Sequence, residues 1–181
     1  MVNDSSTGGY LLPTATDMLA DKELLVFLQS WFVGLTGLSP NLVRPGWQYE
    51  SPNIPDLSVN WIAFVILKRN ADTYVATEQQ ETNEQIIRHE TLELLVSCYG
   101  PNSDMVAHTI REGMQVPQNR EALCTGGIKV IGSANGASFP EYINNRWIKR
   151  VDLPVSLRRK IITTYPVLPL LTAVINIQSQ P

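Results

Sequence analysis

Apolar and polar residues alternate most regularly between positions 91 and 99 of this chain. An alternation with a period of two predicts a strand that buries one face, and Leu95 is its single exception. Gly100-Pro101 then ends the strand, because proline has no amide to donate. The positions on the predicted buried face are Leu92, Leu94, Val96 and Cys98.

A helix is predicted directly after this turn, from Ser103 to Met114 or Gln115. We expect Asn102 or Ser103 to accept its first free amides, and Asp104 places negative charge at the positive end of the helix dipole. The predicted inward stripe consists of Val106, Ala107, Ile110 and Met114.

An earlier helix is predicted from Asp17 or Asp21 to Gly37, which is placed to stop it. Its apolar residues recur at helical spacing, and the stripe is wide enough that we expect the helix to be covered on more than one side. The stripe consists of Leu24, Leu25, Leu28, Trp31, Phe32 and Leu35.

The segment between these helices predicts a loop followed by a long hairpin. Residues 41–56 contain three prolines and predict an irregular loop. Residues 57–68 are apolar on both faces, which is typical of a central strand or of a strand covered by a neighbouring subunit. Residues 70–85 are polar and acidic and lead to the strand at 86–99, so the simplest topology is a hairpin with a projecting loop.

The second half of the chain predicts mostly extended structure. A short helical turn is expected at residues 119–123, a short strand at 128–131, and then a loop that continues through Pro140. Residues 142–162 are mainly extended, and Pro154 indicates that this strand lies at an edge or ends a ladder there. The inward positions, interrupted by Lys149, are Trp147, Val151, Leu153, Val155 and Leu157.

Together these elements predict an α+β fold, with a single antiparallel or mixed sheet of four to six strands and two main helices packed on one face. Residues 1–16 predict an N-terminal arm that is flexible or bound to a partner. Residues 17–165 form the predicted domain, and residues 166–181 form a C-terminal extended arm in which 170–177 can make a last strand.

Composition agrees with one folded domain. The chain has 181 residues, of which 44% are hydrophobic, and this is enough for a sizeable core. The net charge of −3 gives no general attraction to nucleic acid or to an anionic membrane. We expect the two cysteines to be reduced and buried.

The sequence contains no catalytic or metal-binding motif. His89 and His108 are the only histidines and fall in different elements, and the glycines lack the spacing of a phosphate-binding loop. We therefore expect no catalytic residue, no metal, no cofactor and no enzymatic activity.

Charged clusters and loop aromatics are the candidates for contacts between subunits or with partners. Three interpretations of the basic cluster stay open: a solvated strand face, a patch that meets an acidic patch on another copy, and a nucleic-acid site. Trp31 and Trp61 fit core positions, whereas Trp47 lies in a loop. The candidates are the basic residues Arg146, Lys149, Arg150, Arg158, Arg159 and Lys160, the acidic residues Glu78, Glu81 and Glu84, and the aromatic residues Trp47 and Tyr74.

In the order and spacing of its elements, the chain resembles the neck or tail terminator proteins of long-tailed bacteriophages across residues 20–165. The most specific matching piece is Gly100-Pro101-Asn102-Ser103, and the strand with Asn145-Arg146-Trp147 is the second. The helix ending near Gly37-Leu38, the loop with Arg44-Pro45, the apolar strand at 61–67 and the hairpin around Tyr74 complete the match.

This resemblance implies a structural virion protein without catalysis. Such proteins form a ring, commonly of six copies, that caps the tail tube and joins it to the head-side neck while DNA passes through the lumen. The implied partners are further copies of the chain, the tail tube protein and the head-side connector or neck proteins, with no membrane and with assembly in the host cytoplasm. The alternatives are a head-closure adaptor of the neck and a small nucleic-acid-binding protein that uses residues 146–160.

Overall fold

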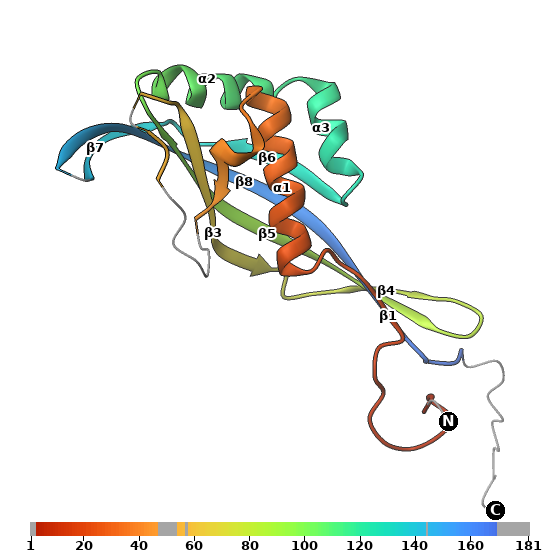
Figure 1. The fold of residues 1–181 in the computed structure, drawn as a ribbon. Coiled ribbons are helices and arrows are strands. Elements are labelled where there is room, and N and C mark those ends of the chain that lie inside the picture. Colours follow the sequence, from red (N-terminus) through yellow and green to blue (C-terminus); the bar gives the residue numbers. More distant parts are fainter. Residues whose placement is uncertain (1–2, 47–53, 57, 144, 170–181) are drawn as a thin grey trace, which may run out of the picture. The chain divides into compact units, whose positions relative to one another are not determined.

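The computed structural model describes residues 3–46, 54–56, 58–143 and 145–169, and it confirms an α+β fold (Figure 1). The helical elements are α1 (Asp21–Thr36), a 3-10 turn η1 (Pro40–Leu42), α2 (Ser103–Gly113) and α3 (Pro117–Cys124). The strands are β1 (Ala15–Asp17), β2 (Val43–Pro45), β3 (Trp61–Ala71), β4 (Ala76–Gln79), β5 (Glu84–Tyr99), β6 (Ile128–Ser133), β7 (Ala137–Ile143) and β8 (Arg146–Tyr165).

The chain divides into two compact units. The larger unit comprises residues 19–72 and 89–160, and the smaller unit comprises residues 1–18, 73–88 and 161–181. The larger unit holds all three helices together with β2, β3, β6, β7 and most of β5 and β8. The smaller unit holds β1, β4, the start of β5 and the end of β8.

The strands of the larger unit follow the order β8-β5-β3-β2, and β6 and β7 pair with β8. β3 and β5 are antiparallel, with Trp61 opposite Tyr99 and Phe64 opposite Val96. Five strands lie in the main order, within the expected range of four to six, and β4, β6 and β7 pair beside it to give eight strands among the described residues. One of them, β2, is a strand parallel to β3 inside the segment that we expected to be a loop.

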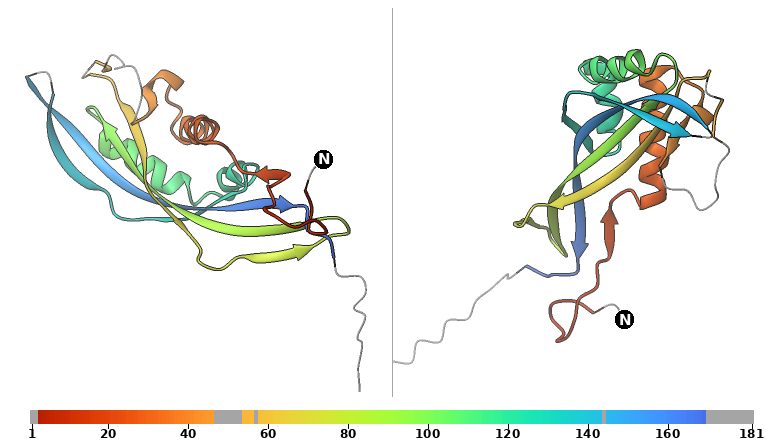
Figure 2. Two further views of the ribbon diagram at one scale, coloured as in Figure 1. Left: turned by 90° about the horizontal axis from the view of Figure 1, so that it is seen from below. Right: turned by 90° about the vertical axis from the view of Figure 1, so that its left-hand side faces the viewer.

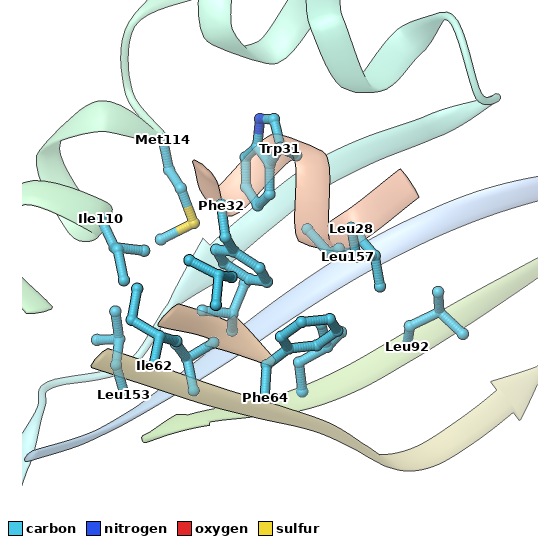
Figure 3. Close-up of a cluster of buried hydrophobic side chains, with 14 of the residues drawn as sticks. Leu28, Trp31, Phe32, Ile62, Phe64, Leu92, Ile110, Met114, Leu153 and Leu157 are labelled. Carbon is cyan, nitrogen blue, oxygen red and sulfur yellow. The ribbon is translucent and has the colours of Figure 1, made fainter. Parts of the chain in front are cut away.

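The core of the larger unit lies between the sheet and the helices, which cover one of its faces (Figure 2). The predicted inward residues of β5 are fully buried, as are Leu153, Val155 and Leu157 of β8. Figure 3 shows these strands meeting the helices around Phe32 and Phe64, whose ring centroids are 5.2 Å apart. Trp31 and Trp61 are both buried, as expected.

Helix α1 begins and ends where the pattern predicted. The Ala20 amide donates to Glu23 Oε2 over 3.1 Å at its start, and Gly37 at its end has a φ of 68°, a left-handed conformation that favours glycine. The Trp31 indole Nε1 donates to the Asn119 carbonyl of α3 over 2.9 Å, so this helix is covered by the sheet and by other helices.

Helix α2 occupies its predicted position, but its start differs from our expectation. Asn102 is the residue before the helix, yet neither its side chain nor that of Ser103 caps a free amide. Instead, the Asn102 amide donates to Asn60 Oδ1 over 2.9 Å, which fixes the turn to the segment before β3. Asp104 does lie in the first turn, as predicted.

Two further elements differ from the pattern-based expectation. The helical turn at 119–123 is the longer helix α3, which begins at Pro117 as a favourable first residue. The loop expected through Pro140 contains β7 instead, because residues 137–143 pair with β8. Ala137 lies opposite Asp152, and Ile143 lies opposite Arg146.

Pro154 ends a ladder, but it does not lie on an edge strand. β8 pairs with β5 on one side, while β7 and β6 pair with it in succession on the other. The β7 ladder ends at Asp152, and the β6 ladder begins at Val155. Pro154 therefore lies at the junction of two ladders, where its missing amide removes no ladder hydrogen bond and its carbonyl accepts from the Ala134 amide over 3.0 Å.

The smaller unit consists of two strand pairs. β4 pairs with the start of β5, from Ala76–Ile87 to Gln79–Glu84, which confirms a hairpin but adds a strand to the segment that we expected to be a loop. β1 pairs with the end of β8, from Ala15–Thr164 to Asp17–Ile162. The predicted last strand at 170–177 and the loop residue Trp47 lie outside the described residues.

Candidate interaction surfaces

A second, smaller cluster of buried residues lies at the start of β3, on the sheet face opposite to the helices. Trp61 and Tyr99 stack with their ring centroids 4.0 Å apart and their planes inclined by 5°. Ile148 of β8 completes the cluster. The guanidinium carbon of Arg150 lies 5.6 Å from the centre of the Tyr99 ring, a cation–π distance.

Arg150 and Asp152 of β8 together connect this strand to β7 and β5 through charged hydrogen bonds. Its Nε and Nη2 donate to the two carboxylate oxygens of Asp152 over 2.7 and 2.9 Å. Its Nη1 donates to Glu141 Oε2 of β7 over 2.9 Å. The Ser97 hydroxyl of β5 donates to Asp152 Oδ1 over 2.7 Å. Burial alone would lower the pKa of Arg150, but the Asp152 and Glu141 carboxylates outweigh it and raise that pKa.

The hairpin formed by β7 and β8 extends past the helices (Figures 1 and 2). Its register pairs Ile143 with Arg146 and leaves only two residues for the turn. The second of them, Asn145, has a φ of 62°, a left-handed conformation that asparagine tolerates well. The strands of the hairpin are therefore joined by a tight turn.

Exposed aromatic side chains lie on both faces of this hairpin. Tyr142 and Trp147 are 57% and 71% exposed and contact each other, with ring centroids 5.2 Å apart. We call this pair the hairpin aromatic surface. Phe139 pairs with Arg150 in the register and therefore points to the opposite face, where it is 53% exposed.

Trp147 was predicted to point into the core, and this was wrong. It does lie on the same face of β8 as the buried Val151 and Leu153. However, the strand continues beyond the helices at that point, so no layer covers the indole among the described residues.

Most of the basic cluster is paired within the chain. Arg158 Nη2 lies 2.5 Å from Asp72 Oδ2, and Lys149 forms an ion pair with Asp104. Arg159 is buried, and its Nε lies 2.6 Å from Glu90 Oε2. With Arg150 also paired, only Arg146 and Lys160 of the six are exposed side chains with no ion pair in the described structure. A role for these residues between subunits stays a prediction.

The acidic candidates lie in the smaller unit. Glu78 is on β4, Glu84 begins β5, and Glu81 is in the turn between them. Tyr74 precedes β4 and is 89% exposed. By sequence the smaller unit contains five acidic residues and one basic residue, a formal charge of −4, whereas the larger unit has a formal charge of +1. The acidic character of this chain is thus concentrated in the smaller unit.

A groove of about 200 Å³ lies between the start of α1 and β3 in the larger unit. We call it the α1–β3 groove. Its lining is mostly apolar and includes Leu25, Phe64 and Ile66. At its rim, Arg69 Nη2 lies 2.8 Å from Asp21 Oδ1, and these side chains are partly exposed.

The described residues contain no cluster of three or more side chains that could hold a metal ion. His89 and His108 are both exposed. Cys98 is buried, but Cys124 is exposed, so the expectation of two buried thiols was wrong for Cys124. In the part of the chain that the structure describes, no helix is long and apolar enough to cross a membrane.

A comparison with protein families finds a match to the phage neck terminator protein family over residues 22–181. No curated protein matches the sequence significantly. The family match includes α1 apart from its first residue, the turn at Gly100, the hairpin with Trp147 and every other element except β1. Because it covers most of the chain, this protein belongs to the phage neck terminator family, whose members are structural proteins of the virion neck and tail.

Proposed function

We propose that this protein forms a terminator ring at the end of the phage tail. Six copies close the upper end of the tail tube and join it to the head-side connector or neck proteins. The DNA passes through the lumen of the ring without being read. The protein would assemble in the host cytoplasm and remain in the neck of the virion.

The hairpin aromatic surface is the observation that supports this proposal most directly. Exposed tryptophan and tyrosine side chains that lie in contact are typical of the centre of a protein interface. Tyr142 and Trp147 lie on a hairpin with a tight turn, and Arg150 at its base bonds to Glu141 of β7 and lies over the Tyr99 ring of β5. A surface on such a hairpin loses little conformational entropy when it binds, which favours assembly of the protein with copies of itself.

The charge distribution supports contact with proteins more than contact with DNA. Four of the six residues in the basic cluster are paired with carboxylates of the same chain. These pairs reduce the charge that could neutralise phosphates, which is the main source of affinity for nucleic acid. The acidic residues of the smaller unit would instead meet a basic surface on a partner.

The proposal is tested by measuring the mass of the purified protein by light scattering, alone and after mixing with tail tube protein. We expect a hexamer in solution, or a monomer that becomes a ring on tube ends, where electron microscopy would show an annular cap. Binding to the connector but not to the tube would favour a head-closure adaptor. A protein that binds neither itself nor the tube would contradict the proposal.

A further inference from the structure

We propose that the hairpin aromatic surface of one copy docks in the α1–β3 groove of the next copy. The contact would be the same between every pair of neighbours, so that copies join head to tail around the ring. This inference rests on the proposed ring and adds the two surfaces that close it.

The two surfaces lie at opposite ends of the strand order in the larger unit. β7 pairs only with β8 at one end, whereas the groove is lined by β3, next to β2 at the other end. A closed ring of identical subunits needs two different surfaces that complement each other. These surfaces meet that requirement because they differ and lie at opposite ends of the strand order, so one copy can offer each of them to a different neighbour.

Both surfaces also lie on the helix side of the sheet. Trp147 lies an even number of positions before Val151 and Leu153 on β8, so its side chain is on the same face as theirs, which pack towards the helices. In the groove, Phe64 and Ile66 of β3 pack with α1 on that same side. A neighbour in the same orientation therefore presents its hairpin to the correct side of the sheet. Because Phe64 is level with Leu153 in the register, that neighbour must also be shifted along the strands to bring Trp147 to the groove.

The chemistry of the two surfaces is complementary. The partly exposed Leu25 and Ile66 offer apolar contact for the Trp147 indole. At the rim, the guanidinium of Arg69 can lie over that indole, and the carboxylate of Asp21 can meet Arg146, the exposed cation beside Trp147. The groove thus offers a contact for the Trp147 indole and one for the Arg146 guanidinium.

The sheet edges themselves favour contact through side chains over the addition of a strand. β7 contains Pro140, which has no amide to donate. Beyond Phe64, β3 has a register shift between Ile66 and Lys68, followed by the charged residues Lys68 and Arg69. Bulges, charges and proline are the features that prevent strands from adding to an exposed edge.

The contact can be tested by cross-linking in assembled tails. Arg146→Cys and Asp21→Cys are combined in a chain that also carries Cys124→Ser, since Cys124 is the exposed thiol. Both positions are exposed, so the variant keeps its core and also keeps Trp147. A short bismaleimide should then give a series of covalent multimers that ends at the size of the ring. Either single-cysteine variant should give none.

The matched control uses the two faces of the hairpin. Adding Trp147→Ala to the double-cysteine chain should reduce cross-linking at least tenfold, whereas Phe139→Ala removes a similarly exposed ring from the other face and should change it less than twofold. Equal effects of the two alanine variants would contradict the docking.

Other results would also overturn the inference. Dimers from Arg146→Cys alone would show that hairpins meet hairpins. Rings that form normally but do not cross-link would show that another contact closes the ring, and the proposed function would stand. If the unmodified protein forms no ring with or without tail tube, the proposed function itself fails.

Discussion

Glu90 on β5 and Arg159 on β8 form an ion pair of 2.6 Å in which the side chains are only 11% and 6% exposed. The Ser97–Asp152 and Thr91–Arg158 hydrogen bonds follow the same register. Residue numbers decrease along β5 in the direction in which they increase along β8. The two strands are therefore antiparallel. The Glu90–Arg159 pair fixes that register from within the core, where a shift by one residue would bury an unpaired charge.

Removing one member of this pair should therefore be costly. We expect Arg159→Met to lower the free energy of unfolding by about 3 kcal/mol, because the Glu90 carboxylate stays buried without its partner. Lys160→Met, at the exposed neighbouring position, should change it by less than about 0.5 kcal/mol. Urea unfolding of the two variants measures both values. Equal stabilities would show that the pair contributes little.

The turn at Gly100 should tolerate no side chain. Gly100 has a φ of 107°, and a Cβ there would lie 2.6 Å from the Val59 carbonyl oxygen. We expect Gly100→Ala to destabilise the protein by about 2 kcal/mol or more in thermal or urea unfolding.

Gly34 provides the opposite control. It lies inside α1 with nothing within 4 Å of the added Cβ. Gly34→Ala should stabilise the protein by about 0.5–1 kcal/mol, since alanine favours the helix. A loss of stability at Gly34, or none at Gly100, would contradict this account of the two glycines.

Stability should fall in alkaline solution. Burial, with a smaller contribution from the Asp152 carboxylate, raises the pKa of the Cys98 thiol from 9.0 to about 12. Burial also raises the pKa of Tyr99 from 10.0 to about 12, although Arg150 opposes this. The native state keeps both protons where the unfolded chain loses them, so their contribution is complete below pH 9.0 and is lost as the pH rises to about 12.

Unfolding measured as a function of pH checks this expectation. Tyr99→Phe should remove the part of the decline that begins near pH 10.0, and Cys98→Ala the part that begins near 9.0. The two variants are compared by the slope of the free energy of unfolding against pH, because each substitution also changes packing and so shifts the absolute value. A slope that neither substitution alters would assign the alkaline loss to other groups.

Arg150 should control how firmly the hairpin is held. In Arg150→Met, Asp152 keeps only its hydrogen bond from Ser97, and Glu141 loses its cationic partner. We expect a loss of about 2–3 kcal/mol and faster amide hydrogen exchange in β7. Tyr142→Ala removes an exposed ring from the same hairpin and should leave β7 exchange unchanged. Unchanged exchange in Arg150→Met would show that β7 is held by its backbone alone.

The local elements were predictable where one chemical signal dominates. The period of two along β5 and the stop signal at Gly37 each specify the structure with no knowledge of the rest of the chain. β7 could not be found this way, because its apolar residues do not alternate regularly, it contains Pro140, and it is a strand only through its pairing with β8. Likewise, β2 is only three residues long and is defined by its parallel partner β3.

The candidate surfaces were less predictable, because they depend on contacts between distant residues. The basic cluster is close in sequence, but Arg158 and Arg159 find their partners Asp72 and Glu90 on other parts of the chain. Trp147 follows the inward pattern correctly and is nevertheless exposed, since only the structure shows where the helices end. The sequence did contain a signal for the hairpin turn, because two asparagines, which tight turns favour, precede Arg146 and Trp147.

The uneven distribution of charge has a practical consequence for handling the protein. A formal charge of −3 describes the sum, while the smaller unit alone carries −4. Molecules on an anion-exchange resin would consequently attach through the same acidic residues, and their elution would depend on salt more steeply than the total charge suggests. An isoelectric point is then a poor guide to purification.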